Sequence, residues 1–167
     1  MRWLCALVII VCSSLCGFGK VLSLKNRTVQ LADILTGLEL MKSEIGQRQA
    51  PMAELARTLS ENSSGVSREL FSNLDMLMPL IDTLGFAGIW RKSVSVLPLR
   101  DEERAALERL ETTLGRYDAQ SQCREIDACI ARFGDFERAA AAEYRKNGRM
   151  YAGLGLTLGF MLAVLAI

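Results

Sequence analysis

The sequence predicts an all-α fold, a compact antiparallel bundle of five or six helices flanked by an N-terminal and a C-terminal transmembrane helix. Apolar residues recur at intervals of three and four through most of residues 28–144, which is the period of one helix face. Proline and glycine interrupt this pattern often, so we expect short loops between neighbouring helices. Two uncharged runs, residues 3–19 and 150–167, flank the patterned region.

Each uncharged run is just long enough to cross a membrane, since a helix needs about 17 to 25 mostly apolar residues to do so. The first run leaves an alternative open, because Arg2, the apolar stretch after it, and the small residues Ser14 and Cys16 also fit a cleaved signal peptide. Lipidation of Cys16 is disfavoured, since the bulky Leu15 precedes it. The predicted domains are 1–19, an N-terminal transmembrane helix or signal anchor; 20–149, a helical-bundle domain; and 150–167, a C-terminal transmembrane helix.

The second run has little polar character besides Thr157 and contains several glycines, which fits lipid better than a soluble core. Its glycines follow no strand, so they do not form a phosphate-binding loop. Gly155 and Gly159 instead have the spacing that lets two membrane helices approach closely. They are the candidate membrane-helix packing residues.

Lysine and arginine near the two runs set the predicted orientation. By the positive-inside rule, these charges place the middle region in the cytoplasm and both termini outside. We therefore expect a multi-pass protein of the cell membrane, in contact with lipids, whose central domain is cytoplasmic. The inner clusters are Lys20, Lys25 and Arg27 after the first run and Arg145, Lys146 and Arg149 before the second, and the one outer residue is Arg2.

The cysteines are consistent with a reducing compartment. Three of the five (Cys5, Cys12 and Cys16) lie in the first run. Cys123 and Cys129 are six residues apart, which places them on different faces of one helix, so neither a disulfide nor a metal pair is indicated.

Composition excludes several function classes. The net charge is +1, with 20 basic and 19 acidic side chains interspersed, so no long-range field would attract nucleic acid. The chain has no histidine, which removes the commonest general base and the commonest metal ligand. We expect no cofactor and no metal.

The first half of the middle region predicts, in order, a helix at 28–47, a shorter helix at 49–61, a loop at 62–65 and a helix at 66–81. Pro51 is expected in the first turn of the second helix. Pro79 is expected to kink or end the third helix near Met78. Gly85 and Gly88 are expected to break the chain next.

The second half predicts helices at 89–97, at 101–114 and from 118 onward. The alternation within 93–96 would also suit a short strand, but helix is favoured because no partner strand exists. Asp101 is placed to cap the second of these helices and Gly115 to end it. The last helix is expected to run almost directly into the C-terminal span, loosened at Gly134 and Gly148.

Acidic residues can be combined into candidate catalytic pairs, Glu39 with Glu44 or Asp118 with Glu125 and Asp127. A simpler interpretation is that Asp118 caps a helix and that Glu39 and Glu44 lie on solvated faces. Neither cysteine of the middle region has a histidine to activate it. The residues therefore predict no catalytic site and no enzyme.

Three aromatic residues, Trp90, Phe133 and Phe136, are most simply interpreted as core. Trp90 is also the candidate partner surface, because exposed tryptophan is common where proteins bind each other.

Two stretches carry a resemblance to a known family. One is residues 31–45 (LADILTGLELMKSEI), followed shortly by Pro51 and Met52; the other is residues 110–118 (LETTLGRYD), with Gln122 four residues later. Together with Trp90, the two terminal runs and the basic cluster before the second run, they resemble the stage III sporulation protein AB family over nearly the whole chain.

This resemblance implies a structural part of the sporulation channel complex in the mother-cell membrane around the forespore, required for forespore development. It also implies a middle domain similar to the cytoplasmic domains of the inner-membrane platform protein of type II secretion and type IV pilus systems. The implied partners are other sporulation channel subunits and a secretion-type ATPase. A membrane-anchored adaptor or regulator outside any channel is the alternative, and a membrane-bound hydrolase is a third hypothesis.

Overall fold

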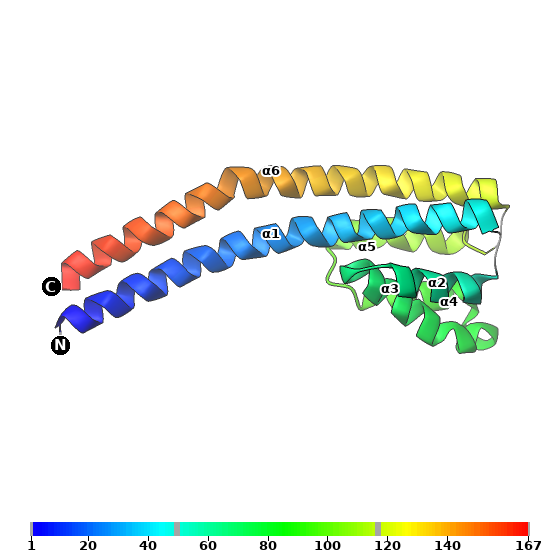
Figure 1. Cartoon of the computed structure of the whole chain (residues 1–167), viewed down its shortest axis with the longest axis horizontal. Helices are drawn as coiled ribbons and strands as arrows, with labels where there is room; N and C mark the ends of the chain where they lie inside the picture. The colour runs from blue at the N-terminus through cyan, green and yellow to red at the C-terminus, as the bar shows by residue number, and fades with distance from the viewer. Residues whose placement is uncertain (1, 49–50, 116–117, 167) are drawn as a thin grey trace. The chain divides into compact units, whose positions relative to one another are not determined.

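The computed structural model describes the backbone of residues 2–48, 51–115 and 118–166, and the side chains of residues 19, 21–47, 51–115, 118–147 and 150. The elements are α1 (Arg2–Arg48), α2 (Met52–Asn62), α3 (Gly65–Leu77), the 3₁₀ helix η1 (Met78–Leu80), α4 (Ile81–Ser95), α5 (Asp101–Glu108), the 3₁₀ helix η2 (Arg109–Thr112) and α6 (Ala119–Ala166) (Figure 1). No strand occurs in the described residues, which confirms the predicted all-α class.

The chain divides into two compact units. One is Gln30–Phe136, and the other combines Met1–Val29 with Glu137–Ile167. The charges divide unevenly between them. Gln30–Phe136 carries 17 acidic and 12 basic residues, a net charge of −5, whereas the other unit carries 2 acidic and 8 basic residues, a net charge of +6. The bundle is therefore acidic although the net charge of the whole chain is only +1.

Within the part of the chain whose side chains are described, no helix is both long enough and apolar enough to cross a membrane. The backbone is helical throughout residues 3–19 and 150–166. Apart from Gly19 and Met150, the side chains of both runs lie outside the described residues. The two transmembrane helices and the packing pair Gly155 and Gly159 therefore stay predictions.

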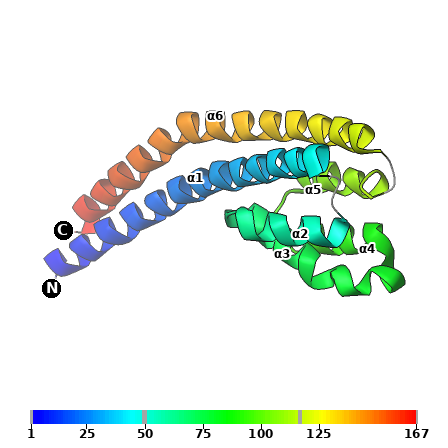
Figure 2. The same cartoon turned by 45° about the vertical axis from the view of Figure 1, so that its right-hand side comes forward.

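Helices α2 to α5 lie beside α1 and α6 in the bundle (Figure 2), and the core is formed by apolar residues from all six helices. The predicted stripes are buried at most positions, because each helix can remove only one face from water. The buried apolar residues of the first half are Leu31, Ile34, Leu38, Met41, Ile45, Leu55, Ala56, Leu59, Val66, Leu70, Phe71, Leu74 and Met78. Those of the second half are Ile89, Trp90, Val94, Leu97, Leu99, Ala106, Leu107, Leu110, Leu114, Ile126, Cys129 and Phe133.

The third predicted helix ends as its proline indicates. α3 stops at Leu77, and η1 holds Pro79 in the tighter 3₁₀ turn. The change of helix type alters the register of the following residues. Ile81, predicted on the buried face, is 37% exposed for this reason.

The predicted breaks at Gly85 and Gly88 have different outcomes. Gly85 has φ +65° and interrupts α4 with a kink, because glycine enters this left-handed region without steric cost. The break predicted at Gly88 is wrong, since this residue is helical within α4. The helical prediction for residues 89–97 is confirmed through Ser95.

Two helix starts differ by one residue from the predictions made for Pro51 and Asp101. Pro51 precedes α2 with ψ 145° instead of lying in its first turn. Asp101 is the first residue of α5 and not its cap. The carboxylate of Glu103 closes this end instead, because its Oε2 accepts a hydrogen bond from the backbone N–H of Arg100 at 2.9 Å.

The last helix is confirmed as continuous. α6 begins after Asp118 and runs to Ala166 through the predicted points of loosening, Gly134 and Gly148. A single helix therefore belongs to both units, as does α1 at the other end of the chain.

Candidate functional site

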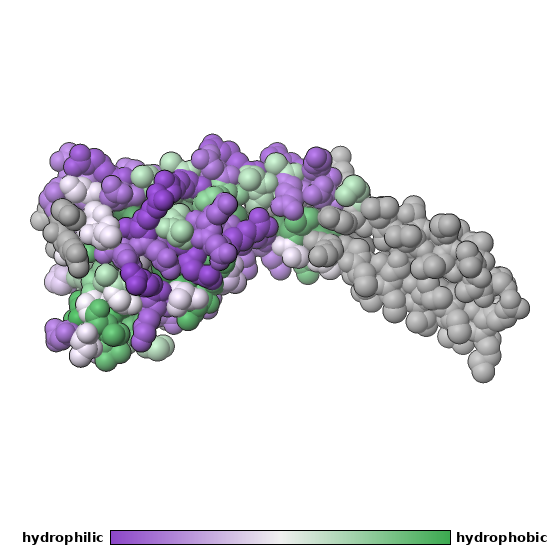
Figure 3. Space-filling view, turned by 180° about the vertical axis from the view of Figure 1, so that it is seen from behind, coloured by the Kyte–Doolittle hydropathy of each residue, from purple (hydrophilic) through white to green (hydrophobic). Residues whose placement is uncertain are grey.

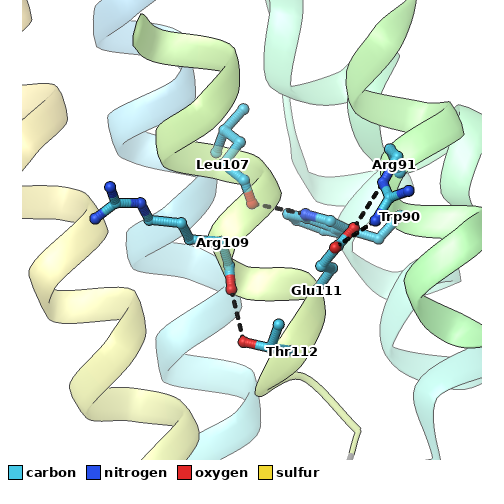
Figure 4. Close-up of polar contacts among 6 residues, drawn as sticks. All are labelled: Trp90, Arg91, Leu107, Arg109, Glu111 and Thr112. Atoms are coloured by element: carbon cyan, nitrogen blue, oxygen red, sulfur yellow. Dashed lines mark hydrogen bonds and ion pairs between the residues drawn. The ribbon is translucent and has the colours of Figure 1, made fainter.

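Trp90 lies in the core, at the junction of α4 with α5 (Figure 4). Its side chain is 0% exposed, and its Nε1–H donates a hydrogen bond to the carbonyl oxygen of Leu107 at 2.8 Å. Phe86 stacks on it, with ring centroids 6.3 Å apart. Burial of a large apolar ring with its one polar group satisfied is stabilising. The core interpretation is confirmed, and the partner-surface interpretation is corrected, since the side chain offers no exposed surface.

A paired hydrogen bond closes the same junction on its outer side (Figure 4). The guanidinium of Arg91 donates to both carboxylate oxygens of Glu111, at 2.6 Å and 3.0 Å. Two parallel hydrogen bonds fix the orientation of the guanidinium relative to the carboxylate as well as the distance between them. In η2, the hydroxyl of Thr112 donates to the carbonyl oxygen of Arg109 at 3.0 Å. The Arg91–Glu111 pair therefore joins α4 to η2, while the Thr112 bond lies within η2.

Of the candidate carboxylates, Glu39 and Asp127 lie in a shallow groove and Asp118 lies at a helix end. A groove of about 490 Å³ between α1 and α6 is lined in part by Glu39, Lys42 and Asp127. Lys42 Nζ lies 2.6 Å from Asp127 Oδ1, and this hydrogen bond raises the pKa of Lys42. Both side chains are well exposed to solvent. Glu44 does not line the groove.

Asp118 caps α6, as predicted. Its Oδ2 accepts a hydrogen bond from the backbone N–H of Ser121 at 3.1 Å. Hydrogen bonding by the side chain and then the backbone of Ser121 lowers the pKa of Asp118. Among the described residues, no three acidic, cysteine or histidine side chains gather closely enough to hold a metal ion. Asp118 thus caps a helix, and Asp127 forms an ion pair with Lys42.

The two described cysteines are free thiols with different surroundings. Cys129 is buried, and its thiol donates to the carbonyl oxygen of Ala106 at 3.6 Å. Burial raises the pKa of Cys129 to about 12, so the reactive thiolate is scarce at neutral pH. Cys123 is partly exposed and contacts the carbonyl oxygen of Lys42 at 3.7 Å.

The first family-like stretch, residues 31–45, is the buried part of α1. Gly37 permits a close approach to α3, because a Cβ built on it would lie 2.5 Å from the Cβ of Ser67. One turn earlier, Asp33 Oδ2 accepts a hydrogen bond from the backbone N–H of Val66 at 3.4 Å. The polar and glycine positions of this stretch therefore join α1 to α3.

The second family-like stretch forms the turn from η2 into α6. Gly115 ends the preceding helix with φ +75°. Its backbone N–H donates to Oε1 of Gln122 at 3.3 Å, and Gln122 is buried. Asp118 caps the next helix. The described residues of this stretch therefore have structural roles, at the end of one helix and the start of the next. Residues 116 and 117 lie outside the described residues.

An exposed apolar surface lies where α3 gives way to η1 and α4. We call residues 76–84 the α3–α4 tip. Figure 3 shows hydrophobic side chains gathered at this end of the bundle. Sequence reasoning missed this surface, because it assigned Leu77, Met78 and Ile81 to a buried helix face and made no assignment for Met76, Leu80 or Leu84. The exposed residues are Met76 (71%), Leu80 (44%), Ile81 (37%) and Leu84 (39%).

These features define an all-helical bundle domain, with its polar groups used mainly for caps, turns and surface ion pairs. The chain belongs to the stage III sporulation protein AB family, whose family model matches residues 2–167. Membership indicates a role in sporulation.

Two relatives agree with this assignment. The chain is 25% identical to stage III sporulation protein AB of Bacillus subtilis (strain 168) over 170 residues, which covers 99% of this chain and 98% of that protein. A solved structure of stage III sporulation protein AB is similar in fold, with a TM-score of 0.62 at 20% identity, covering 71% of this chain and 96% of that chain.

Proposed function

We propose that this chain is a non-enzymatic membrane scaffold component of the sporulation channel complex, in the mother-cell membrane around the forespore. The proposal rests on the structural roles of the residues that resemble the family. Asp33, Gly37, Gly115 and Gln122 all serve packing or turn geometry. Residues that stabilise a helical bundle, and catalyse nothing, are what a scaffold protein needs to present a surface to its binding partners.

The proposed topology supports this role. Both uncharged runs continue as helix into the bundle, since α1 and α6 are each unbroken. The basic clusters beside the runs favour a cytoplasmic bundle. There the domain would contact a secretion-type ATPase and other sporulation channel subunits, while the terminal helices contact lipid and neighbouring spans.

A complementation experiment separates the scaffold from a hydrolase. In cells lacking the native copy, chains carrying Glu39→Gln or Asp127→Asn should restore spore formation fully. Leu38→Asp and Leu114→Asp should fail, because each buries an unpaired charge in the core. Loss of spores with Asp127→Asn at normal protein level would support catalysis and contradict the proposal.

A pull-down from sporulating cells separates the scaffold from an adaptor. The tagged full chain should bring down the secretion-type ATPase and other channel proteins. Recovery of a soluble regulator without any channel protein would favour the membrane-anchored adaptor. The Leu38→Asp chain is the matched control, because it keeps the terminal runs while its bundle should be unfolded.

Cysteine labelling tests the topology. In a chain without its native cysteines, we would place one cysteine at Glu61, whose side chain is 63% exposed, and in another variant one after Ile167. The variants would be expressed in growing, non-sporulating cells, whose membrane faces the medium directly. An impermeant reagent added to these intact cells should label only the second. Labelling of position 61 from outside would contradict the cytoplasmic placement.

A further inference from the structure

We propose that the α3–α4 tip docks a basic amphipathic helix of another protein of the assembly. The inference rests on the proposed scaffold function and adds the surface and the chemistry of the partner. Such a helix would present apolar residues about one turn apart, flanked by lysine and arginine.

The first argument is the concentration of exposed apolar area. Eight large hydrophobic residues are exposed in the described part of the chain, and four of them lie within the tip. Single exposed apolar residues need no explanation, whereas a contiguous patch marks an interaction site. The four side chains come from three successive elements, α3, η1 and α4, so they share one projecting end of the bundle.

The second argument is the sign of the surrounding charge. Between Arg68 and Arg91 the chain has three charged residues, Glu69, Asp75 and Asp82, and all are acidic. Asp82 is exposed and Asp75 partly exposed. The bundle as a whole has a net charge of −5. An apolar surface with carboxylates beside it, on a bundle of net negative charge, attracts a partner whose apolar anchors are flanked by positive charge.

The same charge disfavours two other occupants. Two copies of the tip in a symmetric contact would bring like carboxylates together, which is repulsive. An anionic membrane surface would be repelled in the same way, since such surfaces bind polybasic segments. A basic helix is the occupant that the charge favours.

The tip is held in place by the core behind it. The kink at Gly85 separates the short turn 81–84 from the rest of α4. Directly after the kink, Phe86 stacks on the buried Trp90. A surface fixed in this way loses little conformational freedom on binding. Substitutions at its exposed side chains should leave the fold intact.

In-cell photo-crosslinking of the full chain tests the proposal. Benzoylphenylalanine would replace Leu80 or Leu84 in the only copy of the chain in sporulating cells. The matched control is Arg57 on α2, whose side chain is 75% exposed. Mass spectrometry would then identify the crosslinked segment. We expect one shared partner segment from both tip positions, helical in pattern and net positive, and about tenfold less product from the control.

A charge variant supplies an independent readout. Asp82→Lys, combined with the probe at Leu84, should lower the yield of that product several-fold, because it places like charge against the partner. Met76→Ser with the same probe should lower it by loss of an apolar contact. Circular dichroism of each variant should match that of the parent chain.

Crosslinking to a second copy, to lipid or to an acidic segment would overturn the proposal, as would an undiminished yield with Asp82→Lys. Absence of product at both tip positions, in cells that sporulate normally, would also overturn it while leaving the scaffold function standing. Normal sporulation after deletion of the whole chain would instead reject the proposed function.

Discussion

The carboxylate of Asp33, in α1, accepts a hydrogen bond from the backbone N–H of Val66, in the first turn of α3, at 3.4 Å. The residue before α3, Ser64, makes no capping hydrogen bond with its own side chain. Asp33, 33 positions away from Val66, therefore acts as part of the N-terminal cap of α3. Its negative charge also lies at the helix N-terminus, where the helix dipole favours it. The contact couples helix formation to the packing of α1 on α3.

Replacing Asp33 with alanine should lower the free energy of unfolding by about 0.5 to 2 kcal/mol, the range for loss of a helix N-cap. Denaturant unfolding of the full chain in micelles, followed by circular dichroism, would measure this change. Ser64→Ala is the control and should have almost no effect. Equal losses from the two variants would show that Asp33 does not cap α3.

Gly37→Ala should destabilise the bundle by about 1 to 3 kcal/mol, as overpacking does. The added methyl group would meet the Cβ of Ser67 at 2.5 Å and a ring carbon of Phe71 at 3.1 Å. Gly46→Ala, one helix face away, is the control, because its Cβ would lie no closer than 3.7 Å to Cys123 Sγ. Thermal unfolding should lower Tm for the first variant only, and a neutral Gly37→Ala would refute the close approach of α1 and α3.

Gly115→Ala should cost about 1 to 2 kcal/mol, because φ +75° is unfavourable for a residue with a Cβ. Gly134→Ala should instead raise the free energy of unfolding. This glycine is helical and a Cβ there would meet nothing within 4 Å, so alanine should stabilise α6 by about 0.5 to 1 kcal/mol. Chemical denaturation of both variants should show shifts of opposite sign.

The cap at Asp118 predicts a pH dependence. Hydrogen bonding from Ser121 lowers the folded pKa of Asp118 below its ordinary value of 3.8. The stabilising effect of the charge is therefore fully present above that ordinary value and is lost as pH falls through the lower folded pKa.

The difference in Tm between the parent chain and Asp118→Ala should accordingly be constant near neutral pH and shrink in acid. Asp118→Asn keeps an uncharged acceptor, so its difference from Asp118→Ala should vary little with pH. A parent-to-alanine difference that grows in acid would contradict the assigned cap.

Thiol labelling should distinguish the two cysteines of the bundle. At pH 8, Cys123 should react with a small maleimide while Cys129 stays unmodified, because burial raises the pKa of Cys129 to about 12 and blocks access. Peptide mapping after digestion would assign the modified positions. In denaturant both should react at similar rates, and fast native labelling of Cys129 would show that the α5–α6 contact opens.

Much of the bundle could be predicted from periodicity, because a helix that buries one face must repeat its apolar residues with the helical period. Leu31, Leu38, Leu107 and Leu114 are buried for this reason. The turn residues were harder to assign. Gly85 and Gly88 look alike in sequence, and only Gly85 adopts a positive φ, because the path of the chain after η1 requires it there.

The sequence by itself determined the all-α class, the family and the two uncharged terminal runs, since composition and local periodicity act over a few turns of helix. Tertiary structure decided the exposure of residues that periodicity assigned wrongly or left open. It buried Trp90, which composition left available to a partner, and exposed Ile81, which periodicity placed inside. The reason is physical: burial depends on which helix packs over a face, and contacts such as that of Asp33 with Val66 join residues far apart in the sequence.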